Sequence, residues 1–140
     1  MQDPNTIPQE KSTQSTRPTF LWKQRRRSFQ YAWKGICYAF RTQHNMWLHS
    51  AAAVLAIALG ITLHISGENW LIILLCIGLV VALELINTAI ETLADHLHPG
   101  RDPHIGLVKD LAAAAVLVAA VISFIIGCWI FGPGLIALLG

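Results

Sequence analysis

Residues 71–95 read LIILLCIGLVVALELINTAIETLAD, an apolar stretch long enough to cross a bilayer that becomes polar toward its end. A helix turns by about 100° per residue, so Glu91 and Asp95 lie within about 20° of Glu84, and Asn87 lies about 60° to one side. An ionised carboxylate inside hydrocarbon costs roughly 2.5 kcal/mol or more. This polar stripe is therefore expected to face protein, water or a metal ion, and not lipid.

The composition indicates one small membrane domain, with 54% hydrophobic residues among 140 and a mean hydropathy of +0.53. A helical span needs about 20 apolar residues. Windows of that length lie near residues 46–65, 70–93 and 110–131. We expect an all-α fold, an integral membrane bundle of three transmembrane helices preceded by an amphipathic surface helix at about residues 20–43. Because so few helices enclose polar groups poorly, we also expect a homo-oligomer.

The ends of the chain differ from the spans in composition. Residues 1–18 are rich in Ser, Thr, Gln and Pro without an apolar period and are predicted to be a disordered tail, which leaves residues 19–140 as the membrane domain. At the other end, the Gly-Pro-Gly of residues 132–134 is expected to break the last helix and leave a short apolar tail.

The segment before the first span combines an apolar stripe with basic residues. Its apolar residues recur at helical spacing: Trp22, Phe29, Trp33, Ile36 and Phe40. Its basic residues are Lys23, Arg25, Arg26, Arg27, Lys34 and Arg41. We expect this helix to lie in the membrane interface with the N-terminus cytoplasmic and the C-terminus outside, in a multi-pass protein of the inner (plasma) membrane. The cations could also bind anionic lipid headgroups, although a topology signal alone explains them as well. No nucleic-acid partner is expected.

The polar groups of the second span are of the types that phosphoryl transfer requires. That chemistry needs carboxylates that hold Mg²⁺, cations for the phosphates and a base for the hydroxyl proton. Glu84 lies deepest and is the candidate base, whereas Glu91 and Asp95 lie nearer the cytoplasmic end, within reach of a nucleotide-bound Mg²⁺. Lys109 can meet phosphate oxygens, and Asp110 can cap the third span or add an outer contact to metal or nucleotide.

Two other interpretations stay open at this point. The carboxylates could tie helices together or line a pore in a non-enzymatic channel or scaffold oligomer, but the outer half of the span, residues 71–83, carries no polar ring. His96, His98 and His104 could form a transition-metal site, although they lack a supporting Cys or H-E-x-x-H motif. Neither G-x-x-x-x-G-K-[ST] nor G-x-G-x-x-G is present, so spacing alone does not predict ATP as the donor.

Three segments carry a family resemblance. Residues 84–95, ELINTAIETLAD, resemble the signature E-x-x-N-[ST]-A-I-E-x-x-x-D of the small prokaryotic diacylglycerol kinase and undecaprenol kinase family. Residues 28–35, SFQYAWKG, resemble its surface-helix segment, and residues 109–117, KDLAAAAVL, resemble its K-D-x-x-[AS]-[AG]-A-V-L segment. The resemblance runs from about residue 20 to about residue 131. It implies an integral membrane lipid kinase that acts as a homotrimer, with active sites shared between subunits.

The resemblance also implies a role for each polar residue. Glu84 would take the proton from the lipid hydroxyl, Asn87 would orient the reacting groups, and Glu91 would hold Mg²⁺ together with the nucleotide phosphates. The residues expected to shape the nucleotide pocket are Asp95, Lys109 and Asp110. ATP would be the phosphoryl donor, and a membrane lipid alcohol, diacylglycerol or undecaprenol, would be the acceptor.

Gln43 departs from the family pattern. The resemblance places it where many relatives have a metal-binding glutamate. An amide oxygen can ligate Mg²⁺ but brings no charge, so we expect Gln43 to be a weak metal ligand. The segment that carries Gln43 is slightly more similar to the undecaprenol kinase branch of the family.

Overall fold

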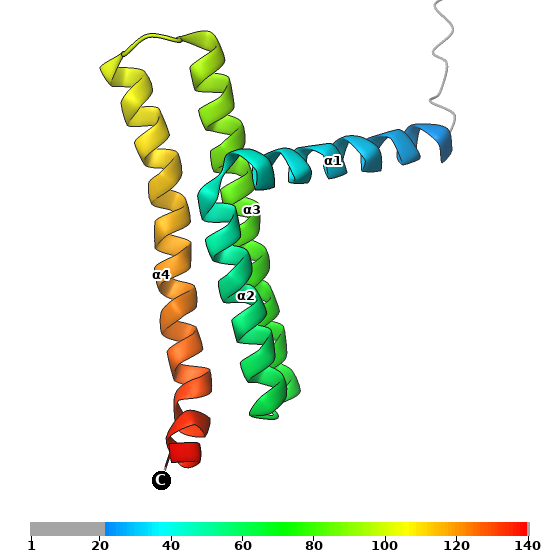
Figure 1. Ribbon diagram of the computed structural model, residues 1–140, viewed down its shortest axis with the longest axis vertical. Helices are drawn as coiled ribbons and strands as arrows, with labels where there is room; N and C mark the ends of the chain where they lie inside the picture. Colours follow the sequence, from blue (N-terminus) through cyan, green and yellow to red (C-terminus); the bar gives the residue numbers. More distant parts are fainter. Residues whose placement is uncertain (1–21, 140) are drawn as a thin grey trace, which may run out of the picture.

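The computed structural model describes residues 22–139, so the predicted tail at residues 1–18 lies outside the described residues. The helices are α1 (Trp22–Thr42), α2 (His44–Thr62), α3 (Gly67–Leu97) and α4 (Pro103–Leu139). No strand occurs between residues 22 and 139. Figure 1 shows α2, α3 and α4 running lengthwise and α1 leaving them crosswise. The expected all-α class is confirmed.

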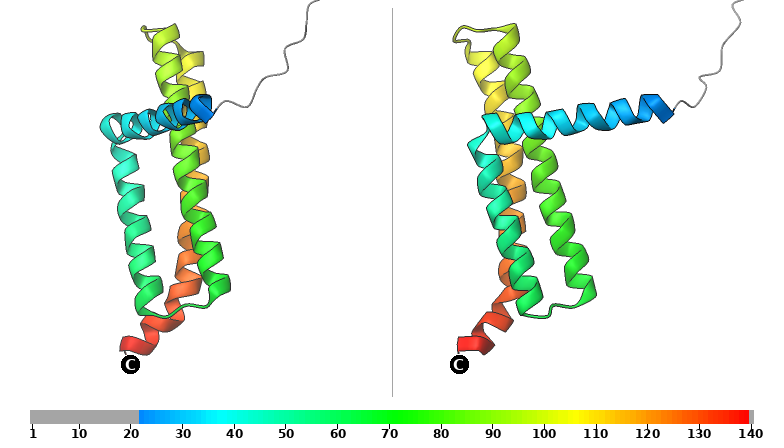
Figure 2. Two further views of the ribbon diagram at one scale, coloured as in Figure 1. Left: turned by 90° about the vertical axis from the view of Figure 1, so that its right-hand side faces the viewer. Right: turned by 45° about the vertical axis from the view of Figure 1, so that its right-hand side comes forward.

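The three lengthwise helices are long and apolar enough to cross a membrane. α2 has 19 residues and α3 has 31. At about 1.5 Å per residue, α3 is roughly 46 Å long and exceeds a hydrocarbon core of about 30 Å. In both views of Figure 2, α3 and α4 extend past the level at which α1 crosses them. The polar end of α3 is therefore positioned to project beyond the spans.

The start of α4 differs from the sequence-based prediction. The helix begins at Pro103, well before the expected span at 110–131. Asp102 caps it, because its Oδ1 accepts hydrogen bonds from the backbone N–H groups of His104, at 2.8 Å, and Ile105, at 3.1 Å. A proline in the first helical position, behind an aspartate cap, is a common way to begin a helix. The capping role considered for Asp110 is therefore wrong.

The end of α4 also differs, because the expected break at residues 132–134 is absent. The helix continues through Pro133 to Leu139, and Figure 2 shows its last turns bending away from the bundle. A proline removes one backbone hydrogen bond and bends a helix, but in lipid the remaining backbone groups are best satisfied by continuing it. Gly134 allows a close approach here, since a Cβ at this position would lie 3.1 Å from Cδ2 of Leu63.

The described core is small and lies between the spans. Its buried apolar side chains include Met46, Ile73, Val80, Val116, Ala119 and Phe131. Gly60 of α2 packs directly on the ring of Trp70 in α3, because an added Cβ would lie 2.8 Å from Cη2. Most large apolar side chains of the spans are exposed, as contact with lipid requires. Against this background, buried polar residues are informative.

Candidate active site

Glu84 is the most deeply buried polar residue of the described chain, with 1% of its surface exposed. Within residues 22–139, neither of its carboxylate oxygens has a hydrogen-bond partner. The hydroxyl of Thr88 lies one turn away but donates to the backbone oxygen of Glu84, at 2.8 Å, and not to the carboxylate. A buried carboxylate without partners is costly. Its free oxygens are therefore available to a ligand or to a proton.

Glu91 lies two turns along α3 and is held by two amides. Gln43 Nε2 donates to Glu91 Oε2 at 2.7 Å, and Asn87 Nδ2 donates to Glu91 Oε1 at 3.1 Å. The Oδ1 atom of Asn87 is buried and has no partner among the described residues. The structure thus brings together Gln43, Asn87 and Glu91, to which the family resemblance assigned metal-binding and orienting roles. We call these three residues the amide clasp.

The sequence of α1 and α2 explains how Gln43 reaches this position. Gln43 is the single residue between the two helices, with an extended backbone (φ −110°, ψ 115°). Its backbone N–H donates to Ala39, at 2.8 Å, and closes the end of α1. Trp47 reinforces the corner, because its indole N–H donates to the backbone oxygen of Phe40 at 2.8 Å and the two rings meet edge to face. The junction therefore holds the Gln43 side chain toward α3.

Asp95 and Lys109 form a third level of the site, nearest the α3–α4 loop. Lys109 Nζ and Asp95 Oδ1 form an ion pair at 2.8 Å, with 34% of the Lys109 side chain and 66% of the Asp95 side chain exposed. An ion pair this accessible contributes less than about 1 kcal/mol to stability. Asp110 is exposed beside it on α4. A hollow of about 500 Å³ adjoins the pair and is lined by the loop, including Arg101.

These levels follow the axis of α3. With a rise of about 1.5 Å per residue, Glu84 lies roughly 10 Å below Glu91, and Asp95 lies roughly 6 Å above it. The sequence-predicted residues therefore occupy one line and do not converge on a single point. Glu84 and Glu91 are too far apart along the helix to share one ion.

The donor set of the amide clasp fits Mg²⁺. It offers one carboxylate and two amide side chains, and Mg²⁺ in nucleotide sites is typically held by one or two carboxylates together with phosphates and water. Among residues 22–139, no group of three or more His, Cys, Asp or Glu side chains could hold a metal ion. The loop histidines His96, His98 and His104 thus do not meet in a metal cluster. The clasp would complete its coordination with substrate phosphates.

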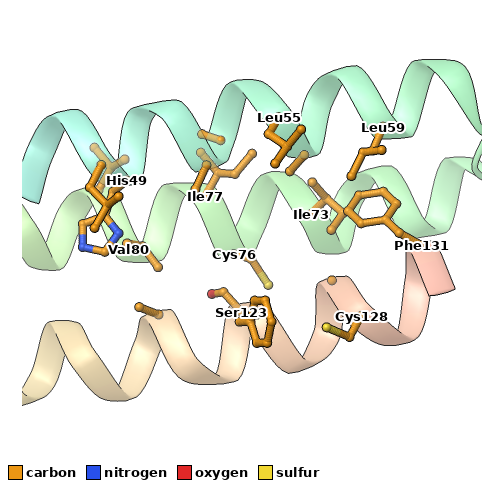
Figure 3. Close-up of a pocket in the computed structure, with 18 of the residues that line it drawn as sticks. His49, Leu55, Leu59, Ile73, Cys76, Ile77, Val80, Ser123, Cys128 and Phe131 are labelled. Carbon is orange, nitrogen blue, oxygen red and sulfur yellow. The ribbon is translucent and has the colours of Figure 1, made fainter. Parts of the chain in front are cut away.

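His49 of α2 is not among the residues that the sequence predicts for the site. It lies near enough to Glu84 on the neighbouring helix for an electrostatic interaction with that carboxylate. It lies at the end of an apolar groove between α2, α3 and α4 that is nearer to α1, and Figure 3 shows its imidazole beside Val80. The signal was available, because a titratable residue inside an apolar span is a candidate functional residue.

The groove itself has a volume of about 630 Å³. Its lining is apolar along most of its length, from Val80 near one end to Leu59 and Phe131 near the other, as Figure 3 shows. Ser123 contributes a hydroxyl from α4. Val80 and Glu84 lie one turn apart on the same face of α3. The groove thus ends close to the buried carboxylate.

The fold and the buried polar residues define a small helical membrane protein with intramembrane carboxylates below a cluster of polar residues at one end of the spans. Residues 30–131 match the family model described as prokaryotic diacylglycerol kinase. The chain belongs to this family of lipid kinases, as the resemblance implied.

Individual relatives agree with this membership. The undecaprenol kinase of Bacillus subtilis is 44% identical over 109 residues, which cover 78% of this chain and 89% of that protein. The diacylglycerol kinase of Synechocystis is 40% identical over 114 residues, 80% of this chain and 65% of its own length. The diacylglycerol kinase of Escherichia coli K12 is 28% identical over 98 residues, 70% of this chain and 80% of its own.

Proposed function

We propose that this protein transfers the γ-phosphoryl group of ATP to the hydroxyl group of a membrane lipid alcohol, with Mg²⁺, at the cytoplasmic membrane interface. The observation that carries the proposal is the Glu84 carboxylate, which is 1% exposed and unpartnered within the described chain. It lies near the end of an apolar groove and one level below the amide clasp. A lipid hydroxyl approaching along the groove would meet a base, and a nucleotide would meet the clasp.

Each of these residues would have a separate role in the reaction. Glu84 accepts the hydroxyl proton as the lipid oxygen attacks the γ-phosphorus, and ADP leaves. Asn87 orients the reacting groups, because its buried Oδ1 is free for a further hydrogen bond among the described residues. Glu91, with the amide oxygen of Gln43 after a half-turn of that amide, would hold Mg²⁺. Bound there, Mg²⁺ supplies positive charge against the phosphate oxygens.

The nucleotide is proposed to lie between the clasp and the α3–α4 loop. Lys109 would meet its phosphate oxygens, and Asp95 and Asp110 would shape the pocket around it. The hollow of about 500 Å³ beside the Lys109–Asp95 pair supports this placement. In this arrangement the lipid comes from the bilayer and the nucleotide from the cytosol.

Undecaprenol is the acceptor that we propose. The support is the undecaprenol kinase relative, which is 44% identical and has 89% of its length matched. The groove is long and apolar, as a polyprenyl chain requires. Diacylglycerol is the competing acceptor, because relatives of that name also match the chain.

The assembly and topology belong to the same proposal. We propose a homotrimer with active sites shared between subunits, an inner-membrane location, a cytoplasmic N-terminus and an external C-terminus. The basic residues of α1 support this orientation, because cations are retained on the cytoplasmic side. Residues 19–140 would form the kinase domain and residues 1–18 a separate tail. The mass of the purified protein in micelles, corrected for detergent, tests the trimer.

The deciding experiment is phosphoryl transfer by the purified protein in detergent micelles. The protein is incubated with labelled ATP and Mg²⁺ and with either undecaprenol or diacylglycerol. We expect label in undecaprenyl phosphate, and we expect Glu84→Gln to abolish it while the protein keeps its helical circular dichroism. Glu68→Gln is the matched control, because Glu68 is exposed at the opposite end of α3. Turnover that survives in Glu84→Gln would refute the assignment of the base.

A further inference from the structure

We propose that His49 is a positioning residue for Glu84, which orients that carboxylate and receives the proton that it removes from the lipid hydroxyl. The inference rests on the proposed lipid kinase function and assigns a proton route to it. Glu84 is sealed from water, so the proton that it takes up needs a route away from the carboxylate after each turnover.

The two residues lie at the same depth. Gln43 and Glu91 are in contact, with 2.7 Å between Nε2 and Oε2, and this contact fixes the relative levels of α2 and α3. His49 lies six residues beyond Gln43, about 9 Å along α2, and Glu84 lies seven residues before Glu91, about 10 Å along α3. Since the two helices run in opposite directions, both displacements point into the membrane. His49 and Glu84 therefore end up level with each other.

The two side chains are also close enough to interact. His49 and Glu91 are the described ionisable residues near enough to Glu84 for an electrostatic interaction with its carboxylate. The imidazole points from α2 into the groove beside Val80, one turn from Glu84 on the same face of α3 (Figure 3). Both Glu84 oxygens lack a hydrogen-bond partner among the described residues, so either can take one from an imidazole that turns toward it.

The other helices offer no alternative partner at this level. The Lys109–Asp95 pair aligns α4 with α3, and eleven residues along each helix bring Ala120 beside Glu84. The α4 side chains buried near this depth are Val116 and Ala119, which carry no titratable group. α1 crosses the bundle at the level of the clasp, roughly 10 Å above. Glu91 shares the sign of the Glu84 charge, so His49 is the described residue that can share its proton.

A histidine on an apolar helix face is often only a packed core residue. Here it lies at the polar end of the groove, level with a buried carboxylate that has no other proton partner from the described helices. Imidazole titrates in the physiological range and can both accept and release a proton. These properties fit a proton-relay role for His49 better than a packing role.

The proton balance of the step is simple. The O–H bond of the lipid breaks as its oxygen forms the new O–P bond, and the proton passes to Glu84. The bond between the γ-phosphorus and the bridging oxygen breaks, and that oxygen leaves on ADP. The Glu84 proton then passes to the free ring nitrogen of His49, which becomes an imidazolium, and water at the cytoplasmic surface removes it. Each turnover releases one proton and regenerates both residues.

The test compares His49→Gln with wild type in the micelle assay. Glutamine keeps a hydrogen-bonding side chain but cannot accept a proton. We expect kcat to fall about tenfold or more, with KM for lipid and for ATP changed less than about threefold. We also expect the inflection of the pH profile of kcat that lies between about pH 5 and 8 to disappear. His64→Asn is the control, because His64 lies in the turn after α2, at the other end of that helix from the site, with φ 50°, which asparagine tolerates.

A measurement on the unmodified His49 keeps the proposal falsifiable if His49→Gln does not fold. The imidazole ¹⁵N chemical shifts are compared in wild type and Glu84→Gln at one pH, and those of His49 are expected to change when the carboxylate is removed while those of His64 do not. Unchanged His49 chemical shifts, or unchanged kcat and pH profile in His49→Gln, would overturn the proposal. The proposed function fails separately, if wild type labels neither lipid.

Discussion

Gln43→Glu gives the sharpest test of the amide clasp. In the structure the Gln43 amide donates to Glu91 at 2.7 Å, so the substitution replaces a donor by a second negative charge at the same place. Two carboxylates about 4 Å apart repel by about 4 kcal/mol at an effective dielectric constant of about 20. Both side chains are half-buried, and solvent and side-chain rotation reduce this to roughly 1–1.5 kcal/mol.

That same charge should attract Mg²⁺. Since about 1.4 kcal/mol corresponds to a factor of ten, the Mg²⁺ concentration for half-maximal activity should fall about tenfold in Gln43→Glu. The assay is labelled phosphoryl transfer to lipid at saturating ATP, with free Mg²⁺ varied above the amount that complexes the nucleotide. In EDTA, the thermal midpoint of Gln43→Glu should be lower than that of wild type, and Mg²⁺ should restore it.

Gln43→Met is the matched control, because it keeps the length of the side chain and removes its oxygen. It should raise the Mg²⁺ requirement and leave the thermal midpoint insensitive to EDTA. If Gln43→Glu showed an unchanged or higher Mg²⁺ requirement, Gln43 would not be a metal ligand, and the clasp would serve only to hold Glu91.

Three further changes test packing, capping and nucleotide binding. Gly60→Ala should destabilise the protein in micelles by about 1–3 kcal/mol, since the new Cβ would lie 2.8 Å from the Trp70 ring. Gly78→Ala is the control and should not destabilise the protein, because a Cβ there would have nothing within 4 Å. Asp102→Ala should cost about 1 kcal/mol through loss of the α4 cap, whereas Asp102→Asn should retain most of it; equal thermal midpoints would contradict the cap. Lys109→Ala should raise KM for ATP several-fold with a stability change below about 1 kcal/mol, and an unaltered KM would remove Lys109 from the pocket.

The burial of Glu84 and Asn87 was accessible from sequence, because the cost of a charge in lipid decides which face of α3 turns inward. The residue at which α4 begins could not be predicted in the same way. Hydropathy locates where a helix becomes apolar, but a helix begins where its first N–H groups find acceptors. Asp102 accepts hydrogen bonds from two of these N–H groups about two turns before the apolar run, so hydropathy alone predicts the cap too late, at Asp110.

Contacts between helices were harder to predict from the sequence. The hydrogen bond between Gln43 and Glu91 joins residues 48 positions apart, and no periodicity within either helix reveals it. The family resemblance suggested that Gln43 belongs to the site, but only the structure shows its amide nitrogen facing the carboxylate. His49 carried a local signal, a titratable group within an apolar span, yet its relation to Glu84 depends on how α2 and α3 are aligned.

A single residue, Gln43, joins α1 to α2, so a movement of α1 is passed directly to the Gln43 side chain. α1 has 21 residues, a length of about 30 Å, and runs crosswise to the spans, and the Gln43 side chain at its end contacts Glu91. A change in the angle between α1 and the spans would therefore move this side chain relative to Glu91, so the orientation of α1 is linked to the geometry of the site.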